Sequence, residues 1–402
     1  MSQGADRTSL NGNLADFHAS IVANRRAILS VHPTPEETKR RFQTLMPLCR
    51  RARITRIGDL TGLDRLGLPV VQAVRPAALS EVTSLGRGFT TIEASMGAIM
   101  ESLERYYAEA IPADRIFLAT AEELEIANGL FDTLVVAGSE DWRSRTIAWI
   151  MGVDVATGHA LPVPVELVHT CYTEPPPVHD GWFVRTTTGL ACHVDAHSAY
   201  LHGLFECIER DAMARAFATH GFFDRMRIRT TGLGPGVDQV CSVAESCGIA
   251  VALWQAPSPT GVPVIWCQTI ETGPGEPMLA LPTEGYAAGP SVEAAAMSAM
   301  LEALAARAGA ISGARDDQTR AHYKRSTEDV VARARKLIAD GVASPMPGAL
   351  GSAIPDAGSL LSSVLAAGLG PAIAVPVGHD LETGVRCVRT VLARAQPFSV
   401  VR

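Results

Sequence analysis

The stretch DAHSAYLHGLFECIER, residues 195–210, contains a pattern that occurs three times in this 402-residue chain. In each copy, a residue that can cap a helix precedes an apolar run, and a glutamate follows the cap by 11 positions. The pairs are Thr90 with Glu101, Asp195 with Glu206, and Ser291 with Glu302. Because an α-helix rises about 1.5 Å per residue, each glutamate lies roughly 16 Å inside its helix. The repeat therefore predicts three long helices that carry acids at one depth.

The first two copies end in the same motif, which reads Glu101-x-x-Glu104-Arg105 and Glu206-x-x-Glu209-Arg210. At about 100° per residue, mostly small residues share a helix face with the acids in all three copies. They are Ala94, Gly97 and Ala98, then Ala199, His202 and Gly203, then Ala295, Ser298 and Ala299. A single glutamate pair at this spacing is typical of a solvated face, but such faces usually carry lysine or arginine among the acids. We infer that the small residues leave space for a ligand and that the acids converge.

Converging carboxylates need cations or protons nearby, since an unpaired buried charge costs several kcal/mol. Glu101, Glu104, Glu206 and Glu209 offer only hard oxygen ligands, which favour Mg²⁺ with water and phosphate oxygens completing its octahedron. The chain has no G-x-x-x-x-G-K-[ST] string, so a P-loop is excluded. The expected ligand is therefore a magnesium-bound nucleoside phosphate.

The chain resembles the YcaO family, whose members use ATP and Mg²⁺ to activate the backbone amides of peptides. The resemblance runs from about Ile54 to Asp317 and continues more weakly to the C-terminus. It rests on the stretches ITRIGDLTGLDRLGLPVVQAVRP, IMESLERYYAE, VPVELV, GLFECIERDA and ISGARDD. Within the family, the chain is similar to the branch encoded beside TfuA-type partners and associated with peptide thioamides. Many azoline-forming cyclodehydratases end in a P-x-P-x-P segment, whereas this sequence ends in PFSVVR.

The resemblance implies roles for the acids and for several neighbours. Glu101, Glu104, Glu206 and Glu209 are expected to hold magnesium against the phosphates of ATP, and Glu104 and Glu209 are also expected to be catalytic. The other residues expected at the nucleotide are Ser84, Arg87, Arg105, Arg210, Glu302 and Arg307. Arg87 stands between two glycines where the family usually has lysine, and it keeps the positive charge. For Arg105 and Arg210, a structural salt bridge is the alternative to phosphate contact.

The resemblance also implies the reaction. A nucleophile adds to the amide carbon of a peptide, the oxyanion attacks the γ-phosphoryl group of ATP, and the phosphorylated oxygen leaves. Sulfide as the nucleophile gives a thioamide, whereas a Cys, Ser or Thr side chain gives an azoline. His202 lies one turn before Glu206, where carboxylates are expected to raise its pKa, so it is a candidate phosphate contact or general acid. A peptide substrate and a TfuA-like protein are the expected partners.

Several positions depart from the family pattern. Gly97 replaces a serine, residues 188–194 lack the usual asparagines, and Ala305 replaces a glutamine. These changes remove hydrogen-bonding groups from the nucleotide side of the pocket. Two hypotheses follow: either the enzyme is active despite lost contacts worth about 1 to 3 kcal/mol each, or the chain is a non-catalytic homologue that binds a peptide or a partner protein.

Other chemistries have less support from the sequence. His193, His197 and His202 suggest a zinc site, but they do not share one helix face, and no cysteine pair accompanies them. The net charge of −7 and the pI near 5.9 argue against binding to nucleic acid or to membrane surfaces. Eight cysteines without a C-x-x-C motif, and a start without a signal region, indicate a cytoplasmic protein. A homo-oligomer is compatible with the sequence.

The expected fold is mixed α and β (α+β), with sheets and three pseudo-repeated helices around the acidic site. Residues 1–52 predict a helical extension, with one helix near residues 24–29 and another opening at Thr34-Pro35. Residues 53–402 predict the catalytic domain, divided into a core of 54–317 and a closing segment of 318–402. The expected strands are LPVVQAV, TIAWIMGV, FVRTTT, IAVALW, PVIWCQTI, AIAVPV and VRCVRTVL. A long connection over residues 341–358 and a last helix from about Leu360 complete the prediction.

Overall fold

In the computed structural model, three long helices carry the acidic motifs, and each begins at its predicted cap. They are α3 (Thr91–Glu109), α4 (Ala196–Ala218) and α7 (Val292–Ser312). The side chains of Thr90, Asp195 and Ser291 each accept a hydrogen bond from the backbone N–H three residues later. The structure describes residues 3–26, 34–273, 277–279, 281–313, 328–343 and 353–398.

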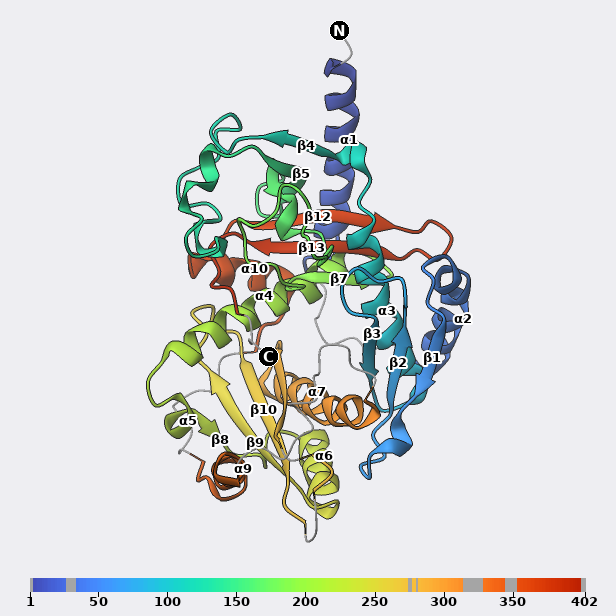
Figure 1. Cartoon of the computed structure of the whole chain (residues 1–402), viewed down its shortest axis with the longest axis vertical. Helices are drawn as coiled ribbons and strands as arrows, with labels where there is room; N and C mark the ends of the chain where they lie inside the picture. The colour runs from blue at the N-terminus through green and yellow to red at the C-terminus, as the bar shows by residue number, and fades with distance from the viewer. Residues whose placement is uncertain are drawn as a thin grey trace.

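Three antiparallel sheets position these helices (Figure 1). The first has the order β1-β2-β3, with β1 (Arg56–Asp59), β2 (Val70–Val74) and β3 (Thr83–Arg87). The second has the order β11-β10-β9-β8, with β8 (Arg227–Ile228), β9 (Ile249–Ala256), β10 (Val264–Glu271) and β11 (Thr283–Ala288). The third has the order β4-β5-β12-β13-β7 and also contains β6, which pairs with β5. Helix α3 packs on β3, α7 on β11 and α4 on β13, so one acidic helix belongs to each sheet.

The strands of the third sheet are β4 (Ile116–Ala119), β5 (Ile147–Asp154), β6 (Ala160–Pro164), β7 (Leu190–His193), β12 (Ala372–His379) and β13 (Arg386–Leu392). The remaining α-helices are α1 (Gln3–Val22), α2 (Pro35–Arg51), α5 (Phe222–Arg225), α6 (Pro235–Ser246), α9 (Glu328–Arg335) and α10 (Ala357–Ala366). Short 3₁₀ turns are η1 (Thr61–Leu63), η2 (Ala113–Arg115), η3 (Asp132–Leu134), η4 (Glu140–Ser144) and η5 (Val165–Leu167), and η6 (Lys336–Asp340) is a π-helical turn. This mixture of helices and sheets confirms the predicted fold class.

The small residues beside the acids bring each helix close to a strand. A Cβ atom on Gly86 of β3 would lie 1.8 Å from the carbonyl oxygen of Ala94 and 2.2 Å from the amide nitrogen of Ala98. A Cβ atom on Gly285 of β11 would meet α7 in the same way, 2.2 Å from the oxygen of Ala299. The backbone of the preceding strand therefore fills the space over these alanines, and the prediction that a ligand fills it was wrong for this part of the face.

Replacing Gly86 by alanine is expected to destabilise the protein by about 3 kcal/mol or more, because the new methyl group would overlap backbone atoms of α3 rather than a flexible side chain. Urea denaturation would measure the loss. Gly62 is a matched control, since a Cβ atom there meets no atom within 4 Å. Equal stability of the two variants would contradict the close approach of β3 and α3.

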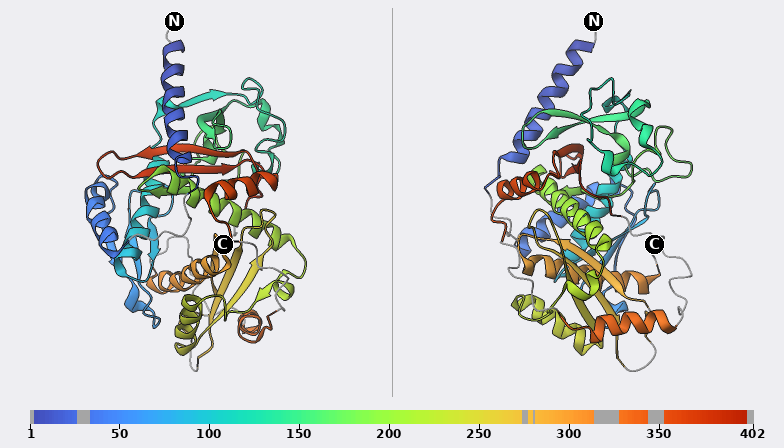
Figure 2. Two further views of the ribbon diagram at one scale, coloured as in Figure 1. Left: turned by 180° about the vertical axis from the view of Figure 1, so that it is seen from behind. Right: turned by 90° about the vertical axis from the view of Figure 1, so that its left-hand side faces the viewer.

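The N-terminal helices differ from the prediction in one respect. Helix α2 begins at Pro35 with Thr34 as its cap, as predicted, and the side chain of Thr34 accepts from the N–H of Glu37. The earlier helix was placed wrongly: α1 ends at Val22, residues 23–26 form a turn, and residues 27–33 lie outside the described part of the chain. The N-terminal end of α1 projects beyond the rest of the chain (Figure 2). Its last turn is anchored, because Ile21 is 1% exposed and its carbonyl oxygen lies 2.6 Å from Nδ1 of His197.

The strand prediction was wrong for two segments. FVRTTT forms no strand beyond an isolated bridge between Phe183 and Val135. The buried carboxylate of Glu166 accepts the N–H groups of residues 181–183, so some of these donors are not available to a sheet. Conversely, residues 190–193 were not among the expected strands but form β7, which pairs with β13. The string Arg315-Asp316-Asp317 and residues 344–352 of the predicted connection lie outside the described residues.

Among the described helices, α7 is long and apolar enough to cross a membrane by length and composition alone. It packs on β10 and β11 inside the protein, and 61% of its apolar window is buried. Buried core helices also meet these criteria of length and composition.

Candidate active site

The two acids of α3 are held by strands from different sheets. Oε2 of Glu101 accepts the N–H of Leu85 in β3 at 3.1 Å, and Oε1 of Glu104 accepts the N–H of Cys192 in β7 at 3.0 Å. These bonds fix both carboxylates where the first and third sheets meet. They also explain why β7 matters, since its backbone supplies a donor that side-chain patterns do not reveal.

The acids of α4 and α7 complete the cluster. Oε2 of Glu206 accepts the N–H of Gly189 at 2.9 Å, and Arg210 pairs with Glu206 at 3.5 Å and with Glu209 at 3.3 Å. Glu206 therefore repeats the arrangement of Glu101, because each accepts an N–H group from the segment that leads into its own helix. Glu302 of α7 pairs with Arg87 at the end of β3 at 2.8 Å, so an ion pair joins the second sheet to the first.

Burial and mutual repulsion raise the pKa values of the central acids. Burial raises the pKa of Glu104 well above its usual value, and Glu101 and Glu206 raise it further, against the N–H of Cys192 and the charge of Arg105. Burial raises the pKa of Glu209 to about 8, with Glu302 and Glu206 adding to the effect and Arg210 opposing it. Acids from three helices thus act on one another, which requires them to lie close together.

The cluster has the charge and the ligand type that a magnesium–phosphate group needs. Among the described residues, three guanidinium groups pair with acids of the cluster, those of Arg87, Arg105 and Arg210. If a bound cation kept all five acids ionised, Glu101, Glu104, Glu206, Glu209 and Glu302 would exceed these guanidinium groups by two negative charges. Within the described residues, no three His, Cys, Asp or Glu side chains are spaced to hold a bare metal ion. Mg²⁺ commonly binds through one or two carboxylates together with phosphate oxygens and water. The residues therefore fit a metal that arrives with a phosphate ligand.

The raised pKa values predict how stability depends on pH. Without divalent cations, folded Glu209 keeps its proton up to about pH 8, whereas the unfolded carboxyl loses its proton near its ordinary pKa of about 4.5. The folded state thus binds more protons between these values, so stability falls as pH rises, by up to about 1.4 kcal/mol per pH unit for each such group. We expect urea denaturation in EDTA to show lower stability at pH 8 than at pH 6.

The variant Glu209→Gln isolates this effect. A hydrogen bond to Asp180 raises the pKa of His169 to about 9 despite burial, and this histidine gives a slope of the same sign. The variant keeps the His169 contribution and removes that of Glu209, so its slope should be shallower than that of the wild type. Parallel slopes would show that Glu209 is ionised across this pH range.

Three residues expected at the nucleotide are buried in contacts within the protein. Arg105 is 7% exposed, pairs with Glu81 at 2.6 Å and Glu101 at 3.0 Å, and also donates to the carbonyl oxygen of Thr83. Ser84 is 1% exposed and shares the face of β3 that packs against α3. Arg307 is 1% exposed. For Arg105, the alternative of a structural salt bridge is therefore the one observed.

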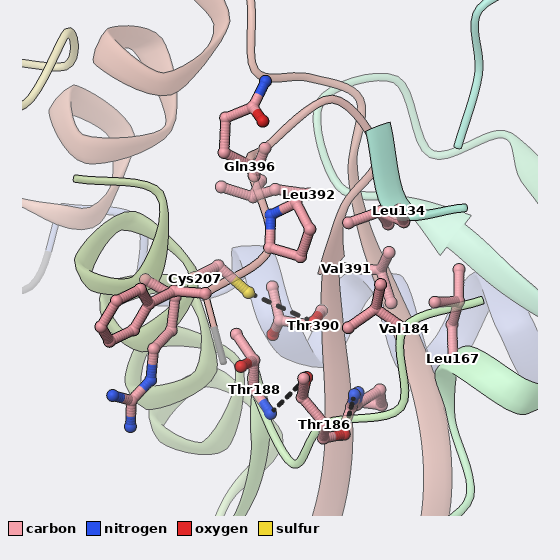
Figure 3. Close-up of a pocket in the computed structure, with 15 residues that line it drawn as sticks. Leu134, Leu167, Val184, Thr186, Thr188, Cys207, Thr390, Val391, Leu392 and Gln396 are labelled. Atoms are coloured by element: carbon pink, nitrogen blue, oxygen red, sulfur yellow. Dashed lines mark hydrogen bonds between the residues drawn. The ribbon is translucent and has the colours of Figure 1, made fainter. Parts of the chain in front are cut away.

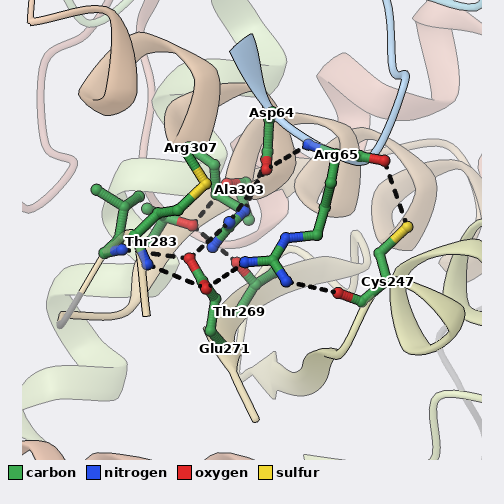
Figure 4. A network of polar contacts seen from close by, with 10 residues as sticks. Asp64, Arg65, Cys247, Thr269, Glu271, Thr283, Ala303 and Arg307 are labelled. Atoms are coloured by element: carbon green, nitrogen blue, oxygen red, sulfur yellow. Dashed lines mark hydrogen bonds and ion pairs between the residues drawn. The ribbon is translucent and has the colours of Figure 1, made fainter. Parts of the chain in front are cut away.

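Arg307 lies in a buried network of its own (Figure 4). Its Nε donates to Asp64 at 2.8 Å, and its Nη2 donates to Asp64 at 3.2 Å and to Glu271 at 2.9 Å. Glu271 also accepts from Arg65 at 2.7 Å. These bonds tie α7 to the loop after β1 and to the end of β10, so Asp64 and Glu271 occupy the guanidinium that was expected at the nucleotide.

Arg87, Arg210 and Glu302 do lie at the acid cluster, as does His202. Partial loss of contact with water lowers the pKa of His202, and the charges of Glu206 and Glu302 oppose this effect only in part. The expectation of a raised pKa was therefore wrong. The side chain is still exposed to solvent. The other two histidines lie elsewhere: His197 contacts the carbonyl oxygen of Ile21, and His193 contacts Asp195.

Sequence analysis missed three backbone donors of the site, the N–H groups of Leu85, Gly189 and Cys192. Gly189 has a φ of +82°, which favours glycine, and a Cβ atom there would lie 2.1 Å from the carbonyl oxygen of Thr390. The glycine was visible in the sequence, but its partner strand β13 is almost 200 residues away, so only the fold shows which groups it brings together.

A family model described as "YcaO cyclodehydratase, ATP- and Mg²⁺-binding" matches residues 85–395, which is more than half of the sequence. The chain belongs to the YcaO family. The cofactors expected from the sequence, ATP and Mg²⁺, are those of this YcaO family. The family match extends beyond the strong part of the resemblance, which ended near Asp317, and includes β12 and β13.

Relatives and solved YcaO structures agree with this assignment. An uncharacterized protein of Methanothermobacter thermautotrophicus is 32% identical over 73% of this chain and 76% of its own length. A Rhizobium leguminosarum bv. trifolii protein described as lying in the tfuA 3′ region is 30% identical over 81% of this chain and 77% of its own length. The structure of YcaO from Methanopyrus kandleri bound with AMPPCP and Mg²⁺ has a TM-score of 0.67 at 21% identity, covering 91% of this chain and 95% of that one.

Proposed function

We propose that this protein activates a backbone amide of a ribosomally made peptide by ATP- and Mg²⁺-dependent phosphorylation of the amide oxygen, and that the product is a thioamide. The observation that supports this best is the meeting of Glu101, Glu104, Glu206 and Glu209 from two helices, since a divalent cation would neutralise these carboxylates in their ionised form. When bound, magnesium-ATP would supply the phosphoryl group and the charge neutralisation that the reaction needs.

Each side chain of the cluster has a distinct task in this proposal. The N–H groups of Leu85, Cys192 and Gly189 orient three of the carboxylates, so the metal ligands need little rearrangement. Arg210 and Arg87 supply positive charge at the cluster and become phosphate partners when the metal takes over the carboxylates. His202 is neutral near pH 7 because its pKa is lowered, so it can accept a proton from the attacking nucleophile.

The positions of two residues that depart from the family pattern, Gly97 and Ala305, favour an active enzyme over a non-catalytic homologue. A Cβ atom on Gly97 would lie 3.3 Å from the Cα atom of Gly86, and Ala305 is 4% exposed in a cluster with Leu60 and Val70. In this chain both positions belong to packed contacts between helix and sheet. Their substitution therefore removes less from the ligand site than the sequence comparison implied.

We further propose that a TfuA-like protein is the partner, that thioamide rather than azoline formation is the reaction, and that the protein works in the cytoplasm. The relative in the tfuA 3′ region supports the first two points. The third is consistent with all eight cysteines being free thiols, each of which lies in the described residues.

Calorimetry with ATP tests the nucleotide part. We expect binding that requires Mg²⁺, and a heat of binding that is the same with and without Mg²⁺ would contradict the proposal.

Mass spectrometry tests the product. A precursor-like peptide encoded nearby is incubated with the protein, the TfuA-like partner, magnesium-ATP and sulfide. Replacement of oxygen by sulfur supports thioamide formation, and loss of water identifies azoline formation instead.

A further inference from the structure

A pocket lies between α4, β13 and the C-terminal segment 395–398 (Figure 3). Figure 3 shows Leu134, Val184 and Val391 on one side of it and Cys207 with Thr188 on the other. Eight of its fifteen lining residues are Leu, Val, Ala, Pro or Phe, and two are arginines, Arg210 and Arg389. None of these lining residues, all within the described part of the chain, is acidic. The pocket is therefore mostly apolar with a positive charge.

Arg389 is the unusual member of this lining. Its side chain is 4% exposed, and Nη2 donates to the carbonyl oxygen of Thr186 at 2.7 Å. Its Nε and Nη1 are buried and have no hydrogen-bond partner among the described residues. Two other buried arginines, Arg105 and Arg307, pair with carboxylates. Leaving buried donors unpaired is costly, so the Arg389 donors indicate an acceptor that is supplied from outside the chain.

The pocket lies next to the acid cluster. Arg389 stands opposite Leu190 in the pairing of β13 with β7, and the N–H of Thr390 donates to the carbonyl oxygen of Gly189 at 2.7 Å. The N–H of the same Gly189 holds Glu206, and Arg210 lines the pocket while pairing with Glu206 and Glu209. A ligand in the pocket would thus lie beside the carboxylates to which the metal is assigned.

We propose that this pocket binds an apolar residue of the peptide substrate, with Arg389 donating an unpaired N–H group to the main-chain carbonyl or carboxylate oxygen of that residue. This inference rests on the proposed function. The apolar lining selects an aliphatic or aromatic side chain, and a charged guanidinium donor fits a carboxyl or amide oxygen. A bare phosphate ion fits less well, because more than half of the lining offers it no donor.

Saturation-transfer NMR without ATP tests the pocket independently of the nucleotide chemistry. The probes are N-acetyl-leucinamide, N-acetyl-leucine and inorganic phosphate. We expect one or both leucine derivatives to bind the wild type and phosphate not to displace them. Tighter binding of the amide indicates an internal residue of the peptide, and tighter binding of the acid indicates its C-terminal residue. If neither derivative binds, or if phosphate displaces them, the proposal is overturned.

Three variants locate the binding. Arg389→Gln should weaken binding at least tenfold, and Leu134→Trp should weaken it as much by filling the pocket while leaving Arg389 intact. Arg185→Gln removes an exposed arginine that stacks on Tyr172 outside the pocket lining, and it should bind as the wild type does. If circular dichroism shows Arg389→Gln to be unfolded, Leu134→Trp decides. Unchanged binding by a folded Arg389→Gln variant or by Leu134→Trp would contradict the assignment.

Discussion

Replacing Glu104 or Glu209 by glutamine is expected to reduce magnesium-dependent ATP turnover by at least about 10²-fold. Glutamine keeps the shape of the side chain, and its oxygen can still accept the N–H of Cys192 in the case of Glu104. It removes the negative charge, so the amide can neither neutralise Mg²⁺ nor hold it firmly against phosphate oxygens. Losses of this size are typical when one preorganised electrostatic group is removed from an active site. Phosphate release in the presence of the peptide and any partner measures the effect.

A loss of turnover in these variants should not reflect unfolding. Burial and neighbouring acids raise the pKa values of both residues, so neutral glutamine should be tolerated, and near pH 8 it should stabilise the protein in EDTA. Glu245 on α6 is the matched control, because its side chain is exposed and the variant Glu245→Gln makes the same charge change. Full turnover by Glu104→Gln or by Glu209→Gln would remove that residue from the metal site.

The variant Arg307→Met is expected to lower the free energy of unfolding by about 3 to 5 kcal/mol. Methionine fills much of the volume but leaves Asp64 and Glu271 as buried carboxylates without their shared partner. The exposed guanidinium of Arg65 can compensate Glu271 in part, whereas Asp64 retains no ion pair among the described residues. Urea denaturation of wild type and variant measures the difference.

The double variant Asp64→Asn with Arg307→Met is the control for this mechanism. Removing the stranded charge should restore part of the lost stability, since the penalty comes from an unpaired carboxylate rather than from lost volume. Calorimetry should show that folded Arg307→Met binds magnesium-ATP with unchanged affinity. A lowered affinity together with unchanged stability would return Arg307 to the nucleotide site.

The acidic helices show how far sequence analysis could go. Helix caps are local, since Thr90, Asp195 and Ser291 each bond a group three residues away, so all three helix starts could be predicted. The role of an arginine is not local. Arg105 and Arg210 occupy the same place in the same motif, yet one is enclosed by Glu81 and Glu101 while the other lies among Glu206, Glu209 and the ring of Tyr286.

The sequence by itself determined the three capped helices, the shared depth of their glutamates and the membership of the YcaO family, because helix geometry acts over three or four residues and motifs keep their spacing. Only the tertiary structure decided which groups meet. Pairing of β7 with β13 brings the N–H groups of Gly189 and Cys192 to the acids and leaves Arg389 with free donors at a pocket. Strand pairing joins residues about 200 positions apart, and no local pattern encodes such a register.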